Sequence, residues 1–305
     1  MRKGEKVGSR KFNTTKENIN LDKVLDEFIV LCERRGLSQT TITGYRYNWK
    51  YFLEFLCDKP ITHNTLSDYV GYLQEQGKKP TTINSYVRNI SPILKFGADM
   101  GYFPKVQFIQ VEECEEIKDI YTQEELDLLL AKPRGKDFTT LRNWTIVWTF
   151  ISTGIRRSEL INLKINNLDL INRTLLLTKT KNKQLRYIPL SSSLIEVLEF
   201  YLNVRKGEGN DYLFPTVFNN KMSNSTLSKA IEGYNTSRGV LKTGIHLFRH
   251  TFITNSINKN VNILTLKKIT GHKNLTVLNR YYNAKTKDII DVIDDITPQL
   301  KRKKL

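Results

Sequence analysis

The chain has 305 residues, with 48 Lys and Arg against 31 Asp and Glu, so its formal net charge is +17. Hydrophobic residues make up 39% of the sequence and aromatic residues 10%, which is enough for packed cores and argues against a wholly disordered chain. No run of about 18 apolar residues occurs, which excludes a membrane-spanning helix, and the polar N-terminus lacks the apolar stretch of a secretory signal.

The charge is divided into blocks along the chain. Residues 1–111 hold 17 basic and 11 acidic side chains, residues 112–133 hold 2 and 8, and residues 134–305 hold 29 and 12. The net charges are therefore +6, −6 and +17. Two interpretations remain open from charge alone: a polyanionic partner, of which nucleic acid is the commonest, and an ordinary lysine-rich surface.

The cysteines predict neither a disulfide framework nor a zinc site. Cys32, Cys57 and Cys114 are odd in number, far apart and without CxxC spacing. A reducing cytoplasm fits this usage.

Residues 1–18 read as a basic tail, and residues 19–108 are predicted to form a helical domain. Apolar residues recur at three- and four-residue steps from Leu21 to Cys32, and Gly36 ends that pattern. Ser38 or Thr40 can cap the next helix, and Pro80 suits the first turn of a later one. Four helices are expected, near 21–32, 42–56, 66–76 and 80–94.

An acidic linker is predicted over 109–121, because the stretch VEECEEIKD has little to bury. Thr122 and Glu125 have the spacing of a capping box, so a second domain over 122–305 is expected to begin there. This domain carries the larger excess of positive charge and ends in a basic tail.

The second domain is predicted to be mostly helical around one small sheet. Phe138–Ser152 resembles a buried helix, and short segments rich in branched residues indicate strands. Strands are expected at 168–170, 174–178 and 186–190, and further helices at 194–204, 226–234, 246–257, 263–270 and 289–296. The fold class is therefore mainly α with a small antiparallel β-sheet in the second domain.

Several short segments carry residues suited to phosphate chemistry. His246 and Arg249 lie three apart on one predicted helix face, where a guanidinium fork and an imidazole can bind the same oxyanion. Arg156, in TGIRRSEL, lies in a turn between two apolar segments. Each pattern alone has an ordinary alternative: a surface His–Arg pair, or a helix break with a solvated Arg.

Two later segments have equally ordinary alternatives when taken alone. The stretch LTKTKNKQLRYIPL predicts a strand, a basic turn and a strand, and places Lys181 at the tip. In LKKITGHKNLTVLNRYYN, Gly271 ends a helix, His272 follows it, and Tyr281 and Tyr282 end the segment. An exposed basic turn and a pair of packed tyrosines would explain these features without chemistry.

Taken together and in this order, the segments resemble the tyrosine recombinases of the phage-integrase type, which include the Xer recombinases. TGIRRSEL matches the motif of the first catalytic arginine, HLFRHTF the His-x-x-Arg box, and Gly271-His272 the Gly-His box. Tyr281 is nine residues after His272, where the family places its nucleophile. Lys181 is eight residues before Pro189, at the position of the hairpin lysine, and Lys179 is its rival.

The resemblance covers about residues 19–295 and implies a two-domain DNA clamp, with a four-helix core-binding domain and a catalytic domain. It implies a site-specific DNA recombinase, an integrase or resolvase of a mobile element, acting through a 3′-phosphotyrosine intermediate. The partners implied are double-stranded DNA with specific recombination sites and a homotetramer formed on it, without a membrane. The expected location is the bacterial cytoplasm, in association with the nucleoid. The implied catalytic residues are Arg156, Lys181, His246, Arg249, His272 and Tyr281.

This chemistry is a metal-independent transesterification, so no metal and no cofactor is expected. The sequence contains no HExxH, EF-hand or Walker motif. Two alternatives remain open: strand cleavage and rejoining like that of a type IB topoisomerase, and a non-catalytic DNA-binding relative.

Overall fold

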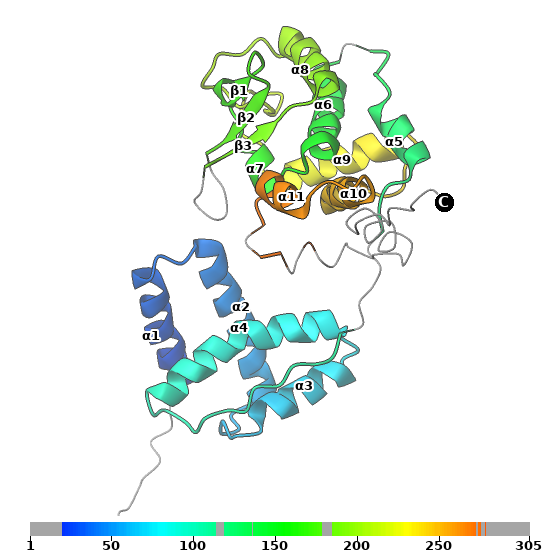
Figure 1. The fold of residues 1–305 in the computed structure, drawn as a ribbon. Helices are drawn as coiled ribbons and strands as arrows, with labels where there is room; N and C mark the ends of the chain where they lie inside the picture. The colour runs from blue at the N-terminus through cyan, green and yellow to red at the C-terminus, as the bar shows by residue number, and fades with distance from the viewer. Residues whose placement is uncertain are drawn as a thin grey trace, which may run out of the picture. The chain divides into compact units, whose positions relative to one another are not determined.

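A computed structural model describes residues 20–113, 119–135, 137–178, 185–272, 274–275 and 278 (Figure 1). The chain divides into two compact units, Met1–Glu116 and Ile117–Leu305, and each has its own hydrophobic core. The fold class is confirmed: the described residues are mainly helical, with one small antiparallel sheet in the second unit. Among the described helices, none combines the length and apolar character that crossing a bilayer requires.

The first unit is built from helices whose ends are set by local sequence. Asn20 caps the first helix by accepting hydrogen bonds from two backbone N–H groups, and Ser38, rather than Thr40, caps the second. Pro80 occupies the first turn of the last helix. The predicted helices are confirmed as α1 (Leu21–Arg34), α2 (Gln39–Leu56), α3 (Thr65–Glu75) and α4 (Pro80–Asp99).

Helices α2 and α4 form the centre of the first unit, since each of them contacts the other three helices. Ile90 of α4 and Phe52 of α2 are fully buried, and Tyr69 of α3 meets the Phe52 ring edge-on with 5.2 Å between the ring centroids. Each large side chain buried in this way contributes about 1.5–3 kcal/mol to folding, so the unit has a substantial core of its own.

The predicted linker is attached to folded structure on both sides. The buried Asn84 amide donates to the carbonyl of Val111 at 2.8 Å and accepts from its N–H at 2.9 Å. On the other side, Tyr121 is 2% exposed and stacks on Phe248. Lys242 pairs with Asp119 at 3.1 Å. The ends of the predicted linker are therefore more buried than its acidic composition indicated.

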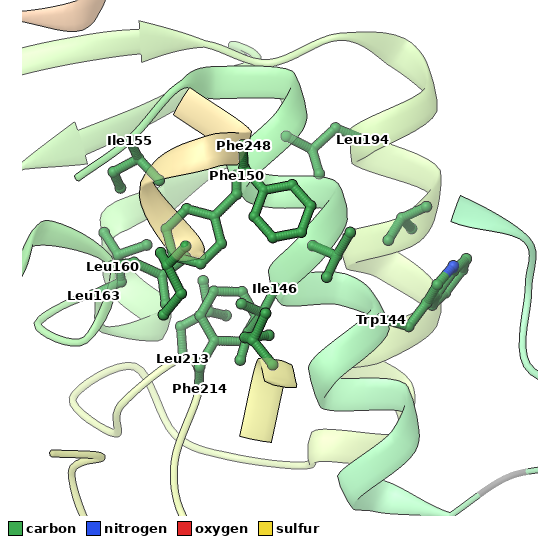
Figure 2. Close-up of a cluster of buried hydrophobic side chains, with 14 of the residues drawn as sticks. Trp144, Ile146, Phe150, Ile155, Leu160, Leu163, Leu194, Leu213, Phe214 and Phe248 are labelled. Carbon is green, nitrogen blue, oxygen red and sulfur yellow. The ribbon is translucent and has the colours of Figure 1, made fainter. Parts of the chain in front are cut away.

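The second unit is arranged around α6 (Phe138–Thr153), which packs against α8, α9 and α10. Figure 2 shows Trp144, Ile146 and Phe150 of this helix among apolar side chains from the surrounding elements. Because α6 is enclosed on several sides, its apolar residues do not form a single stripe. The other helices are α5 (Gln123–Leu130), α7 (Arg157–Leu160), α8 (Ser192–Arg205), α9 (Asn224–Ser237), α10 (Ile245–Asn258), α11 (Ile263–Thr270) and the short 3₁₀ helix η1 (Ile165–Asn167).

The sheet of the second unit runs β1 (Leu168–Asp169), β2 (Thr174–Leu177) and β3 (Arg186–Pro189), all antiparallel. The register pairs Leu175 with Ile188 and Leu177 with Arg186. Strand β3 is an edge strand next to β2, and it contacts α11. This contact brings Arg186, the first residue of β3, to the loop that follows α11.

Candidate active site

Arg156 projects from the turn between α6 and α7. Helix α6 ends at Gly154, whose φ of +58° is a left-handed conformation that favours glycine. The buried Ile155 anchors the turn, and Arg156 then caps α7. Its Nη1 donates to Glu159 Oε1 at 3.0 Å and its Nη2 to the carbonyl of Gly271 at 2.6 Å. The guanidinium is therefore held between α7 and the loop after α11.

Gly154 also fixes α10 against this turn. A Cβ atom at Gly154 would collide with the ring of Phe252 on α10, so the two backbones approach closely. The Gly154 carbonyl accepts a hydrogen bond from Arg249 Nη1. The turn that carries Arg156 and the helix that carries Arg249 are thus joined by packing and by a charge-assisted hydrogen bond.

Arg249 is buried, with 7% of its surface exposed. Its Nη2 donates to the Thr270 carbonyl at 2.8 Å and lies 3.1 Å from His272 Nε2. Three of the predicted residues, Arg156, Arg249 and His272, therefore converge on the short segment 270–272, although they come from separate parts of the chain.

The hydrogen bonds around His272 define its tautomer. Because a guanidinium only donates, His272 Nε2 accepts from Arg249, and the ring proton is assigned to Nδ1. His272 Nδ1 then donates to Thr270 Oγ1 at 2.8 Å, and that hydroxyl donates to the Leu266 carbonyl at 2.6 Å. Burial, with the positive charges of Arg249, Arg156 and Arg186, lowers the pKa of His272 to about 4, so the ring is neutral at pH 7.

Glu159 lies at the centre of the site and was not among the predicted residues. Its side chain is fully buried, and its two oxygens accept from the Arg156 backbone N–H at 2.9 Å and from both Nη atoms of Arg186 at 2.8 Å. Burial alone would raise the pKa of Glu159, but the hydrogen bonds and charges of Arg186 and Arg156 hold it below its usual value. The carboxylate is therefore ionised.

A sequence signal for Glu159 was available, but none marked Arg186. Glu159 lies three residues after Arg156, at the spacing at which a Glu side chain reaches back to cap its own helix. Arg186 is 27 residues away on a strand, so only the folded structure brings the two charges together.

His246 lies on the first turn of α10, three residues before Arg249, as the predicted helix required. The ring is exposed. Its pKa nevertheless lies below the usual value, because the protein displaces part of the water around the ring and because Arg157 and Arg249 add positive charge.

Lys181 and its rival Lys179 lie outside the described residues, as do Tyr281, Tyr282 and the predicted helix 289–296. The strands on either side of the basic turn are described, and the Leu177–Arg186 pair is their last on that side. Leu278, three residues before Tyr281, is fully buried with Ile253 of α10 and Leu266 of α11.

The phage integrase family model matches residues 120–288, more than half of the chain. The chain belongs to the phage integrase family. This tyrosine recombinase is an enzyme of DNA strand cleavage and rejoining, and the resemblance found in its sequence is confirmed.

Relatives and solved structures extend the similarity over both units. The chain is 24% identical to tyrosine recombinase XerC of Staphylococcus carnosus, over 93% of this chain and 100% of that protein. It is 28% identical to tyrosine recombinase XerA of Pyrococcus horikoshii, over 91% and 94%. A Tn1549 transposon integrase in complex with transposon right-end DNA has the same fold, with a TM-score of 0.75 at 20% identity, over 90% of this chain and 99% of that one.

Proposed function

We propose that this recombinase acts on specific sites in double-stranded DNA, cleaving each strand with Tyr281 and rejoining it to a partner strand. The convergence of Arg156, Arg249 and His272 around segment 270–272 carries the proposal. This constellation holds two cationic forks and a neutral imidazole together within one folded unit. A phosphodiester that becomes a doubly charged phosphorane is the substrate that such a site would stabilise.

Arg156 and Arg249 are proposed to bind the non-bridging oxygens of the scissile phosphate. Both guanidiniums are fixed by backbone carbonyls, so little reorganisation accompanies substrate binding. His272 would donate a further hydrogen bond after its Nε2 exchanges Arg249 for a phosphate oxygen and takes up a proton. The negative phosphate favours that protonation, because it offsets the three arginine charges that lower the pKa in the free protein.

In the proposed reaction, the Tyr281 oxygen attacks phosphorus as its proton passes to a base, for which His246 is the candidate. The bond from phosphorus to the 5′-oxygen breaks, and Lys181 gives that oxygen a proton. The product is a 3′-phosphotyrosine ester and a free 5′-hydroxyl. Rejoining is the reverse, with the 5′-hydroxyl of a partner strand as nucleophile, so the ester keeps the bond energy and no cofactor or metal enters the proposal.

The proposed assembly is a homotetramer that joins two duplexes, each carrying two protomers. The proposed setting is a mobile element, as an integrase or resolvase, working in the cytoplasm on nucleoid DNA. The likeness to a transposon integrase supports the mobile-element setting, and the likeness to XerH, a site-specific recombinase solved as a post-cleavage complex on palindromic difH with a TM-score of 0.71, supports action at specific DNA sites. Recovery of an excised circle and an empty target site from host DNA would test this setting.

The activity is tested with a suicide DNA substrate that traps the covalent protein–DNA adduct. Wild-type protein should form a denaturant-resistant adduct. Arg249→Gln should lower the rate of adduct formation by about 100-fold or more, since the loss of one fixed hydrogen-bond donor to a transition-state oxyanion has an effect of that size. Arg173→Gln is the matched control, because Arg173 contacts the Leu190 carbonyl and Ser192 instead.

The absence of any adduct on DNA that the wild-type protein binds would contradict the proposal and favour a non-catalytic DNA-binding protein. Relaxation of supercoiled DNA without a specific site would favour the topoisomerase-like alternative.

A further inference from the structure

All three guanidinium nitrogens of Arg186, the first residue of β3, donate hydrogen bonds inside the candidate active site. Its Nη1 and Nη2 each donate to one oxygen of Glu159 at 2.8 Å, and its Nε donates to the Ile269 carbonyl at 3.2 Å. The Arg186 side chain is only 12% exposed. Two parallel bonds to one carboxylate fix the plane of a guanidinium, a geometry that a lysine cannot reproduce.

This fork determines where Glu159 can lie, and Glu159 in turn holds Arg156. Glu159 Oε1 is shared by Arg186 and Arg156, at 2.8 and 3.0 Å, while Oε2 is shared by Arg186 and the Arg156 backbone N–H. Loss of the Arg186 fork would leave a buried carboxylate with Arg156 as its remaining charged partner among the described residues. The existing pair of Arg156 with Glu159 would then be stronger, and less of the Arg156 charge would be left to act on a phosphate.

Arg186 also supports the loop that carries His272. Gly271 has a φ of +65°, and a Cβ atom there would lie 2.6 Å from Arg186 Nη1 and 3.1 Å from Arg156 Nη1. The backbone of Gly271 thus lies directly on both guanidiniums, and His272 is the next residue. Together with the bond to the Ile269 carbonyl, this contact makes Arg186 a support for both ends of segment 269–271.

The net charge of the described residues at the site agrees with a supporting role for Arg186. Glu159 pairs with Arg156 and Arg186, and Arg249 lies beside His272, so these three guanidiniums and one carboxylate leave two positive charges in excess. A phosphorane formed from a phosphodiester carries two negative charges. Without Arg186, Glu159 would cancel one of the two charges needed at the transition state.

We propose that Arg186 is a positioning residue for strand cleavage: it neutralises Glu159, which frees the Arg156 charge for the phosphate, and it supports the Gly271–His272 loop. The inference rests on the proposed function of the site. It assigns Arg186 no contact with DNA, so its removal should act on the rate of cleavage rather than on DNA affinity.

The test compares Arg186→Met with wild type on two suicide substrates, one with a normal scissile phosphate and one with a methylphosphonate. Cleavage of the phosphodiester should fall by about 30-fold or more, with DNA affinity within about threefold of wild type. The methylphosphonate lacks one non-bridging oxygen and its charge, so its transition state needs less positive charge. The variant should therefore lose much less rate on it, which a general loss of packing would not produce.

Arg173→Met is the matched control, the same substitution beside the same sheet, and should cleave both substrates at the wild-type rate. If Arg186→Met does not fold, Arg186→Gln serves the same comparison, because it also removes the cation beside Glu159 while keeping an amide that can donate a hydrogen bond. An equal loss of cleavage rate on the two substrates, or no loss, would overturn the inference. As long as the wild-type protein cleaves DNA, that result would leave the proposed function unaffected. Failure of the wild-type protein itself to cleave would instead contradict the proposed function.

Discussion

Tyr281 and its neighbour Tyr282 are not both expected to reach one phosphate, since successive residues would point about 100° apart if their segment formed the helix that the sequence predicts. Tyr281→Phe removes one hydroxyl and should keep folding and DNA binding while abolishing the covalent adduct on a suicide substrate. Tyr282→Phe, the matched control, should keep the adduct. Peptide mapping of trapped DNA to Tyr282 would shift the nucleophile by one residue.

Lys181 is expected to be the general acid because its spacing to Pro189 places it at the hairpin tip. Lys181→Ala should lose cleavage of normal DNA and regain it on a substrate with a 5′-bridging phosphorothiolate, whose sulfur leaves without a proton. Lys179→Ala is the control and should cleave both substrates. Rescue of Lys179→Ala by the sulfur substrate would transfer the role to Lys179.

His272 should make the stability of the free protein depend on pH. Its pKa is about 4 in the folded protein and near 6.5 when unfolded, so between these values the unfolded chain binds the extra proton. The free energy of unfolding should therefore fall as the pH is lowered from about 7 to 4. In His272→Asn, which keeps a polar group near Thr270, this fall should be smaller in denaturant titrations at pH 7 and 4.5. An identical fall in both proteins would show that His272 is not held neutral.

Single residues were predictable from the sequence where they stand in a local motif, and not where their partner is remote. Arg156, His246, Arg249 and His272 were located by short motifs, and the structure places Arg156, Arg249 and His272 together. Arg186 was read only as the start of a strand, because its pairing with Glu159 depends on how β3 packs against α7 and α11. Lys181 and Tyr281 remain predictions, since they lie outside the described residues.

At the level of elements, the sequence predicted the helix starts that capping residues set and the helices that periodic apolar residues form. The capping box of Thr122 and Glu125 is present at the start of α5, and the Ser38 cap begins α2. Gly36 follows the end of α1 as the expected stop. The strands are shorter than predicted, because a short segment of branched residues indicates a strand without showing where pairing stops.

No secondary structure was predicted from the sequence for the connection between α8 and α9, and tertiary contacts hold it in place. The buried Arg142 of α6 donates to the Pro215 carbonyl at 2.8 Å, and Tyr201 of α8 donates to the Leu213 carbonyl at 2.9 Å. Isolated bridges pair Lys164 with Tyr212 and Pro215 with Lys221. Apart from the Pro215–Lys221 bridge, these partners are at least 12 residues apart in the sequence, so local periodicity carries no sign of them.

The predicted C-terminal helix 289–296 gives a test at the level of an element. Its apolar residues lie beyond the proposed nucleophile and are expected to dock on a neighbouring protomer. A chain truncated before Asp288 should still bind a single site on DNA and lose strand exchange between two duplexes, as measured by gel assays of bound and recombined DNA. Wild-type recombination by the truncated chain would remove this helix from the assembly.

For the whole molecule, the distribution of charge determines how DNA binding responds to salt. The acidic block lies between two basic ones, and residues 134–305 alone carry a net charge of +17. If the protein neutralises six phosphates, counterion release gives a logarithmic slope of about −5 in salt concentration. Affinity should then fall about a thousandfold between 50 and 200 mM salt.

This salt dependence separates the role of the surface charge from that of the active-site arginines. Binding isotherms can be measured by fluorescence anisotropy at several salt concentrations for wild type and Arg249→Gln. The slopes of log affinity against log salt concentration should differ by only about one unit, since the variant removes one phosphate contact. Its cleavage rate should nevertheless fall by orders of magnitude. An affinity almost independent of salt would mean that contacts other than phosphates dominate binding, and the +17 charge would then be an ordinary lysine-rich surface.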